Sequence, residues 1–324
     1  MRFAFTDDQL AFRDAVRDLL AKESPPEAVR TGWHAIDRAP GGAAIPAWKA
    51  LEEMGVLGVM SPEEAGGLGL TALDLVLLLE ESGAVAFPGP IVEHAMVGAP
   101  LLRDRVGASA VVTAPFHDGP AVPYADVATH LLLVDEGDWH LVERADVELT
   151  NVESVDGARH LATVAWTPTA ETMVASGVDA AHAFDRGVLG TAAQLTGLAR
   201  RMILMTVEYV AERRQFGVPV GSFQAVKHHL ADARIALEFA QPLVYRAAWS
   251  MTHADPDASV HVSMAKAQAS DAAALAARKA LQCHGAIGYS FEHDLHLFLK
   301  RTWALAAAWG DAAWHRDRVG RAIL

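Results

Sequence analysis

Hydrophobic residues make up 52% of the 324 residues, with few aromatics, which is typical of a mostly helical protein with two or three sizeable cores. A net charge of −13 argues against nucleic acid or an anionic membrane as the main partner, and the single cysteine, Cys283, excludes an internal disulfide and fits a reducing compartment. No signal-peptide pattern and no uncharged apolar run of membrane-spanning length is found, so we expect a cytoplasmic protein that is not inserted in a membrane.

The first third of the chain has a helical pattern. Thr6 and Gln9 form a capping-box signature before an apolar stripe, and the pair Pro25 and Pro26 is expected to end that helix. Thr71 opens a second strongly apolar stretch, which predicts a buried helix. The expected helices cover residues 7–22, about 46–54 and from 71 onward, with a further apolar segment over 90–102.

The pattern changes from about residue 108. Short β-prone runs over 110–114, 130–135, 139–143 and 161–166 are separated by Gly, Pro and Asp turns. This region predicts a small antiparallel sheet or partial barrel.

The last part of the chain is again helical. The expected helices run over 185–212, 223–252, 260–283 and 292–308, followed by a last helical segment. Short connections between four long helices predict an antiparallel bundle.

The turn RRQFGVPVGSFQ, from Arg213 to Gln224, joins the first two bundle helices. Gly217 and Pro219 break the helix, and Ser222 is predicted to cap the next one. Arginine forks match phosphate oxygens, and a helix N-terminus adds a positive dipole end, so the turn could hold a phosphate. Arginine at a helix C-terminus is also favoured by the helix dipole alone, so this motif in isolation leaves both interpretations open.

Two motifs together resemble the acyl-CoA dehydrogenase family. The pattern R-x-x-F-G followed seven residues later by Gln matches Arg213, Phe216, Gly217 and Gln224, and Q-x-x-G-G-x-G-Y is nearly matched by Gln282, Gly285, Ala286, Gly288 and Tyr289. The resemblance covers nearly the whole chain. It implies a mainly α fold with a small β domain: an N-terminal helical domain over 1–107, an abridged middle β domain over 108–177 and a C-terminal four-helix bundle over 178–324.

The family holds FAD at a subunit interface. One subunit contacts the flavin ring, and its neighbour contacts the pyrophosphate and adenine. The resemblance therefore implies a neighbour-side set in this chain, consisting of Arg213, Phe216, Gln224, Gln282, His284, Gly285 and Gly288. The ring-side segment T-E-P-x-A-G-S is replaced by TAPFHDGP over 113–120, and ESVDGARHLATVAW, with Asp156 and Arg159, resembles the strand near the end of the middle domain.

The family's catalytic glutamate has no counterpart at either usual position. Pairing Arg301 with the family's arginine places Gly310 at the glutamate and Trp309 at the tyrosine before it, and the alternative glutamate position is Gly187. Glycine cannot remove a proton. Asp311 is the nearest carboxylate and has two interpretations, a weak catalytic candidate or a helix N-cap.

Two further groups of side chains, a tryptophan pair and a His/Asp cluster, lie in the last part of the sequence. Trp303 and Trp309 are expected to fill the space that a substrate chain and a tyrosine occupy in relatives. His293, Asp294 and His296 lack a nearby further ligand, so we expect solvated surface and no metal site.

We interpret the chain as the short, non-catalytic subunit of a hetero-oligomeric acyl-CoA dehydrogenase, resembling the small subunits of actinobacterial α2β2 enzymes of steroid degradation. The resemblance implies FAD as cofactor, a longer homologue as partner, an acyl-CoA substrate and electron-transfer flavoprotein as electron acceptor. Two alternatives remain open: an active homo-oligomer that uses Asp311 or another base, and a flavin-free helical interaction protein.

Overall fold

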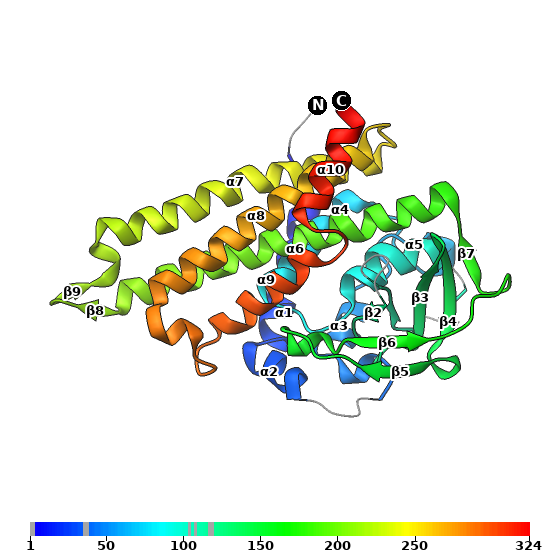
Figure 1. Cartoon of the computed structure of the whole chain (residues 1–324), viewed down its shortest axis with the longest axis horizontal. Helices are drawn as coiled ribbons and strands as arrows, with labels where there is room; N and C mark the ends of the chain where they lie inside the picture. The colour runs from blue at the N-terminus through cyan, green and yellow to red at the C-terminus, as the bar shows by residue number, and fades with distance from the viewer. Residues whose placement is uncertain (1–3, 35–38, 103–104, 107–108, 116–119) are drawn as a thin grey trace.

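The computed structural model describes residues 4–34, 39–102, 105–106, 109–115 and 120–324. Figure 1 shows a long helical bundle that projects to one side and a region of short strands at the opposite end. The mainly helical fold with a small β region is confirmed. The predicted domain boundary at 107/108 lies outside the described residues.

Local capping signals define the N-terminal helices. Helix α1 spans Asp7–Glu23, and Thr6 and Gln9 exchange both capping-box hydrogen bonds, at 3.2 and 2.9 Å. A second capping box between Thr71 and Asp74 begins the buried helix α4, Ala72–Ala84. Helix α3 covers Trp48–Glu53. These predictions are confirmed.

Helix α2, Pro26–His34, was not predicted. Pro25 and Pro26 were interpreted only as a stop signal for α1. Proline is also favoured at the first position of a helix, because its missing N–H has no intrahelical partner there. The apolar segment after α4 forms a buried π-helical stretch over Val92–Gly98 that continues as α5, Ala99–Leu102.

The β region forms two small sheets rather than one antiparallel sheet. The first has the order β1-β3-β4-β7, and the second has the order β2-β6-β5. The pairing of β1 with β3 is parallel, which corrects the antiparallel expectation. The strand bounds are Val112–Thr113 (β1), Ala121–Val122 (β2), His130–Asp135 (β3), Asp138–Glu143 (β4), Glu148–Asn151 (β5), Ala162–Ala165 (β6) and Met173–Ala175 (β7).

The sequence missed β2, β5 and β7. Each is only two to four residues long and exists through pairing with a neighbour, so it lacks the alternating pattern that reveals a longer strand. Asp156 and Arg159 belong to a 3₁₀ turn, Gly157–Arg159 with Asp156 as its N-cap, and not to the strand that follows.

The C-terminal helices form the predicted bundle. Helix α6 pairs along its length with α8, and α7 packs on α8 (Figure 1). The helices span Gly177–Glu212 (α6), Gln224–Thr252 (α7), Ala258–His284 (α8), Leu295–Ala307 (α9) and Ala312–Ile323 (α10). Helix α6 begins at Gly177, where the helical pattern resumes in the sequence, and the apolar run starts only at residue 185 because the first turns of the helix are mostly exposed.

Glycines bring α4 and α6 into direct backbone contact. A Cβ atom at Gly197 would lie 1.9 Å from the Glu80 carbonyl oxygen, and one at Gly83 would lie 2.1 Å from that of Gln194. Beside this crossing, the Thr196 and Tyr245 hydroxyls donate to the buried Glu80 carboxylate at 2.9 and 3.0 Å. The N-terminal helices are therefore fixed against the bundle.

Candidate functional site

The chain reverses between α6 and α7 through a small hairpin. Arg213 ends α6, its N–H donating to the Tyr209 carbonyl at 2.9 Å, and strands β8, Arg214–Gln215, and β9, Val218–Pro219, then pair. Phe216 and Gly217 form the tip, both with positive φ, and Phe216 is 93% exposed. The hairpin therefore presents an arginine and an aromatic side chain to the outside.

The prediction that Ser222 caps α7 is wrong. A 3₁₀ turn over Val220–Ser222 follows β9, so the N-cap is Phe223, and it makes no side-chain capping bond. The Ser222 hydroxyl instead donates to the Pro219 carbonyl at 2.7 Å. Since the first N–H groups of a helix lack intrahelical partners, the start of α7 at Gln224 keeps donors for an outside acceptor.

The second motif forms the turn after α8. Gly285 ends α8 with a φ of +65°, and a 3₁₀ turn runs over Gly285–Tyr289. A Cβ at the buried Gly288 would lie 2.9 Å from Leu281 Cδ1, so a side chain there would have to displace the Leu281 side chain. Ala286 does not have a positive φ, and alanine therefore fits where the family has glycine.

The two motifs meet at the same end of the bundle. The Tyr209 ring, one turn before Arg213, stacks on His284 with centroids 4.4 Å apart. Lys279 Nζ lies 3.0 Å from both His229 Nδ1 and Asp232 Oδ2, which fixes the end of α8 beside the start of α7. The hairpin and the turn after α8, far apart in sequence, thus lie at the same end of the bundle (Figure 1).

His284 has an unused acceptor at this surface. Its Nδ1 lies 2.8 Å from the Ala280 carbonyl, so this nitrogen carries the proton. Burial lowers the pKa of His284, so the ring is neutral and Nε2 is an acceptor. Nε2 is buried and has no hydrogen-bond partner among the described residues. Of the predicted cofactor set, His284 and Gly288 are buried, whereas Arg213, Phe216, Gln224, Gln282 and Gly285 are exposed.

The resemblance assigns the family's catalytic glutamate to residue 187 or 310. The indole ring of Trp309 fills the space beside Gly187. Trp309 is 1% exposed and stacks on Trp139, with centroids 6.2 Å apart. A Cβ at Gly187 would lie 2.5 Å from the Trp309 ring. A side chain at residue 187 therefore has no room beside this indole. Trp309 is buried, as a space-filling role requires, whereas Trp303 is 46% exposed and fills no interior space.

The turn that contains Gly310 is held on both sides. Lys266 Nζ donates to the Gly310 carbonyl at 3.0 Å and to the Ala306 carbonyl at 3.1 Å, and burial lowers its pKa to about 7. His315 Nε2 lies 2.8 Å from the Trp309 carbonyl. These hydrogen bonds hold the backbone of the turn in place. No sequence pattern indicated a buried role for Lys266, because a lysine within an Ala-rich helix is typical of an exposed face.

Asp311 caps helix α10. Its Oδ1 accepts from the Trp314 N–H at 2.8 Å, and the residue is exposed. We therefore expect Asp311→Ala to lower the free energy of unfolding by about 1 kcal/mol, measured by urea denaturation. Acyl-CoA oxidation by a flavin-containing complex should change by less than about twofold.

The matched control for this substitution is Asp317→Ala on the same helix, which removes only an exposed pair with Arg321 and should change stability by less than about 0.5 kcal/mol. A loss of oxidation of roughly 100-fold or more in Asp311→Ala would identify this residue as a general base instead.

A cavity of about 410 Å³ lies beside Trp309, between the β3–β4 turn and the start of α6. Aromatic rings of Trp139, Phe184 and Trp309 form part of its wall, and its carboxylates, Glu136 and Asp138, belong to the turn. The segment predicted to replace the family's ring-side motif, residues 113–120, lies partly outside the described residues.

A buried ionic cluster joins the β region to the bundle. Arg301 Nε donates to Asp156, and its Nη1 donates to the Phe87 carbonyl at 2.6 Å. Glu93 lies in the same cluster, where burial raises its pKa to about 7. The sequence contained a signal for this cluster, since Glu93 and His94 interrupt an otherwise apolar segment.

Among the described residues, no group of three or more His, Cys, Asp and Glu side chains could hold a metal. The interpretation of His296 as solvated surface is wrong: it is buried against Trp33 and Phe291, and neighbouring Asp294 pairs with Arg30. Cys283 is free and buried, as predicted. Within the same described ranges, no helix has the length and apolar character needed to cross a membrane.

The structure has a helical bundle packed on a small β region, and comparison with known proteins identifies the family that has this architecture. Residues 6–105 match the model of the acyl-CoA dehydrogenase N-terminal domain, and residues 177–324 match that of the C-terminal domain. The chain belongs to the acyl-CoA dehydrogenase family, whose oxidoreductases act on the CH–CH group of acyl-CoA and are generally flavoproteins.

Three relatives illustrate the similarity. Acyl-CoA dehydrogenase IpdE2 of Mycobacterium tuberculosis is 29% identical over 305 residues, covering 91% of each chain. The crystal structure of the ChsE4-ChsE5 complex from Mycobacterium tuberculosis matches with a TM-score of 0.87 and 24% identity, covering 99% of this chain and 98% of that one. A variant of the Tcur3481-Tcur3483 steroid ACAD matches with a TM-score of 0.81 and 22% identity, covering 98% of both chains. The two structures show the same fold.

Proposed function

We propose that this chain is the short, non-catalytic subunit of a hetero-oligomeric, FAD-dependent acyl-CoA dehydrogenase. The observation that carries the proposal is the contrast between the two ends of the site. Trp309 closes the space beside Gly187, and Trp314 and His315 crowd Gly310, so neither position has room for a carboxylate without rearrangement. The surface around Arg213 and His284 is open and keeps unused polar groups.

The residues of the open surface fit the pyrophosphate and adenine end of FAD. The exposed Arg213 guanidinium suits phosphate oxygens, and the uncapped start of α7 at Gln224 supplies backbone donors. Gly285 lets the backbone approach a ligand closely, and the buried Nε2 of His284 needs a donor. When bound, FAD supplies the hydride acceptor for oxidation of a CH–CH bond.

Exposed aromatics support a partner subunit at this end of the bundle. Phe216, Tyr289 and Phe291 are large apolar side chains that are mostly exposed, and such groups around a polar site are typical of protein interfaces. We propose a longer family member as the partner, contributing the flavin-ring contacts and the base. The similarity to the ChsE4-ChsE5 complex and to a steroid ACAD favours a hetero-oligomer and a steroid-derived acyl-CoA. We propose electron-transfer flavoprotein as the electron acceptor, as the family resemblance implies.

The test is co-expression with longer acyl-CoA dehydrogenase homologues from the same genome. We expect a stable complex with about one FAD per heterodimer, whereas the chain purified alone should hold little or no flavin. A yellow homo-oligomer that oxidises acyl-CoA without a partner would contradict the proposal and favour the active homo-oligomer. Absence of flavin from every combination would favour the interaction protein.

Replacing Arg213 by alanine should weaken FAD binding by the complex roughly tenfold or more, because a charge-assisted contact to phosphate is lost. The FAD-to-protein ratio after gel filtration and titration of the apo complex with FAD measure the change. The control is Arg234→Ala on α7, which removes an exposed arginine paired with Glu238. Equal FAD retention in both variants would exclude Arg213 from phosphate binding.

A further inference from the structure

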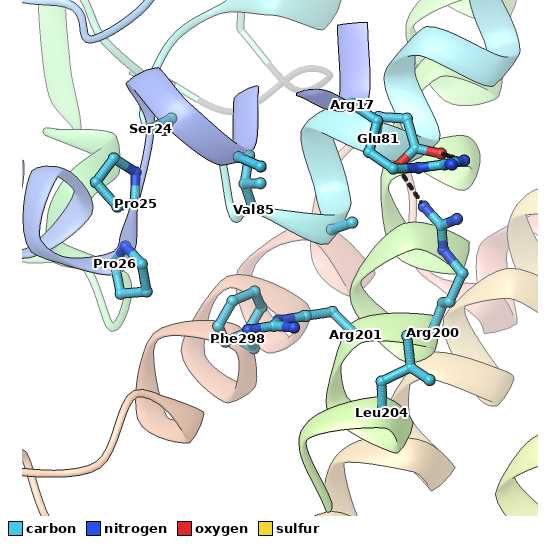
Figure 2. Close-up of a pocket in the computed structure, with 12 residues that line it drawn as sticks. Arg17, Ser24, Pro25, Pro26, Glu81, Val85, Arg200, Arg201, Leu204 and Phe298 are labelled. Atoms are coloured by element: carbon cyan, nitrogen blue, oxygen red, sulfur yellow. Dashed lines mark hydrogen bonds and ion pairs between the residues drawn. The ribbon is translucent and has the colours of Figure 1, made fainter. Parts of the chain in front are cut away.

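A second cavity, of about 330 Å³, lies away from the open surface and from Trp309. Figure 2 shows it between α1, the start of α2, α4, α6 and α9, where the N-terminal helices pack on the bundle. It shares no lining residue with the cavity beside Trp309. Its polar groups and its apolar wall are the two observations that indicate a ligand.

Arginines concentrate positive charge at this cavity, although the chain as a whole is acidic. Arg17 and Arg200 each donate to the Glu81 carboxylate, at 2.9 and 2.7 Å (Figure 2). Burial raises the pKa of Glu81, but the two arginines outweigh it and hold that pKa below its usual value, so Glu81 is charged. The Glu81 side chain is only 2% exposed and is neutralised by its partners.

Arg201 adds a further guanidinium to the same cavity. Its side chain extends toward Phe298 in Figure 2, and it makes no hydrogen bond or ion pair with any described residue. Glu81 is the carboxylate among the described lining residues, and its two oxygens are already used by Arg17 and Arg200. Asp14, outside the lining, is shared between Arg13 and Arg17. Arg201 therefore faces the cavity with its charge unbalanced.

Ser24 supplies a second unused polar group. It ends α1, it is 1% exposed, and its hydroxyl has no hydrogen-bond partner among the described residues. A buried hydroxyl without a partner requires an explanation, and a bound polar ligand would provide one.

The remaining wall of the cavity is apolar. It is formed by Ala21, Pro25, Pro26, Ala84, Val85, Leu204 and Phe298. A bare inorganic anion would leave this surface without a partner, whereas an apolar body attached to the anionic group would cover it.

We propose that this cavity binds a small amphipathic monocarboxylate, its carboxylate on Arg201 and its apolar body against Leu204 and Phe298, with Ser24 at the other side of the same cavity. A carboxylate matches the fork of one guanidinium, and one negative charge is the charge that Arg201 leaves unbalanced. The ligand would bridge the N-terminal helices and the bundle. The inference does not depend on the proposed subunit role, because neither flavin nor a partner takes part.

Octanoate is the probe for this site, titrated calorimetrically into the full chain. We expect saturable binding of one octanoate per chain, with acetate and 1-octanol at least about tenfold weaker, since each lacks one of the two recognised features. Arg201→Gln should weaken octanoate binding about tenfold, and Leu204→Trp should block it by filling the exposed edge of the cavity. Arg234→Gln, which changes an exposed arginine on α7, should bind octanoate normally.

Circular dichroism spectra establish that the variants are folded. Absence of saturable octanoate binding would overturn the proposal. The proposal would also be overturned if Arg201→Gln and Leu204→Trp bound octanoate as tightly as the unsubstituted chain, because the ligand would then lie elsewhere. Inorganic phosphate binding as tightly as octanoate would show a simple anion site and would also contradict an amphipathic ligand.

Discussion

Introducing a carboxylate at residue 310 should destabilise the protein and should not create a dehydrogenase. Gly310 has a φ of +86°, and a Cβ there would lie 2.8 Å from Trp314 Cε3 and 2.9 Å from His315 Nε2. Overpacking costs about 1–3 kcal/mol, and a left-handed conformation costs a side-chain residue about 1–2 kcal/mol. We therefore expect Gly310→Glu to lower the free energy of unfolding by roughly 2–4 kcal/mol, measured by urea denaturation.

The matched control is Ala313→Glu, which adds the same group three residues later. Residue 313 is exposed in the first turn of α10, where a negative charge is favourable, so its stability should be unchanged or slightly higher. The activity of each variant is measured as acyl-CoA-dependent flavin reduction, with the chain alone and in complex. If Gly310→Glu were stable and oxidised acyl-CoA without a partner, residue 310 would have room for a catalytic carboxylate. Crowding at this turn would then not explain the proposed non-catalytic role.

The absence of a glutamate at residues 187 and 310 was predictable from the sequence, but the packing that leaves no room for one was not. The motif register placed glycine at 187 and 310, so the loss of a glutamate could be inferred from sequence alone. That Gly187 lies against the Trp309 indole depends on how α6 packs against the turn before α10, which no local pattern encodes. The same limit explains why Trp303 and Trp309 could not be told apart, although one is exposed and the other buried.

Local signals in the chain predicted local structure well. The capping boxes at Thr6 and Thr71 mark helix starts because the side chain bonds to its own first turn. The parallel pairing of β1 with β3 connects residues that are distant in sequence and left no such signal. Ser222 illustrates a further limit: serine is a good N-cap, but here the preceding turn uses its hydroxyl.

The two motifs that resemble the family's FAD-binding sequences were visible in the sequence, but the geometry that joins them was not. Tyr209 matches neither motif, yet its ring on His284 brings the hairpin and the α8 turn to one surface. Arg201 and Ser24 were likewise invisible, because an arginine in a helix and a serine at its end are ordinary. Their significance lies in missing partners, which only a three-dimensional structure reveals.

Substituting Gly197 by alanine should produce the largest loss of stability among single methyl additions in the helices. The new Cβ would lie 1.9 Å from the Glu80 carbonyl oxygen and 3.0 Å from the Ala84 nitrogen, both backbone atoms that cannot rotate away. Helices α4 and α6 would have to separate, which would disturb the hydrogen bonds of Thr196 and Tyr245 to Glu80. We expect the free energy of unfolding to fall by at least about 3 kcal/mol, measured by urea denaturation.

Gly320→Ala is the matched control, because it makes the same chemical change within helix α10. No atom lies within 4 Å of a Cβ at Gly320. Alanine is the better helix former, so this variant should gain about 0.5–1 kcal/mol. The two substitutions should therefore have opposite signs, since helix propensity favours both and only the α4–α6 contact opposes one. If Gly197→Ala were also stabilising, the N-terminal helices would not be in backbone contact with the bundle, and a ligand bridging them at Arg201 would lose its structural basis.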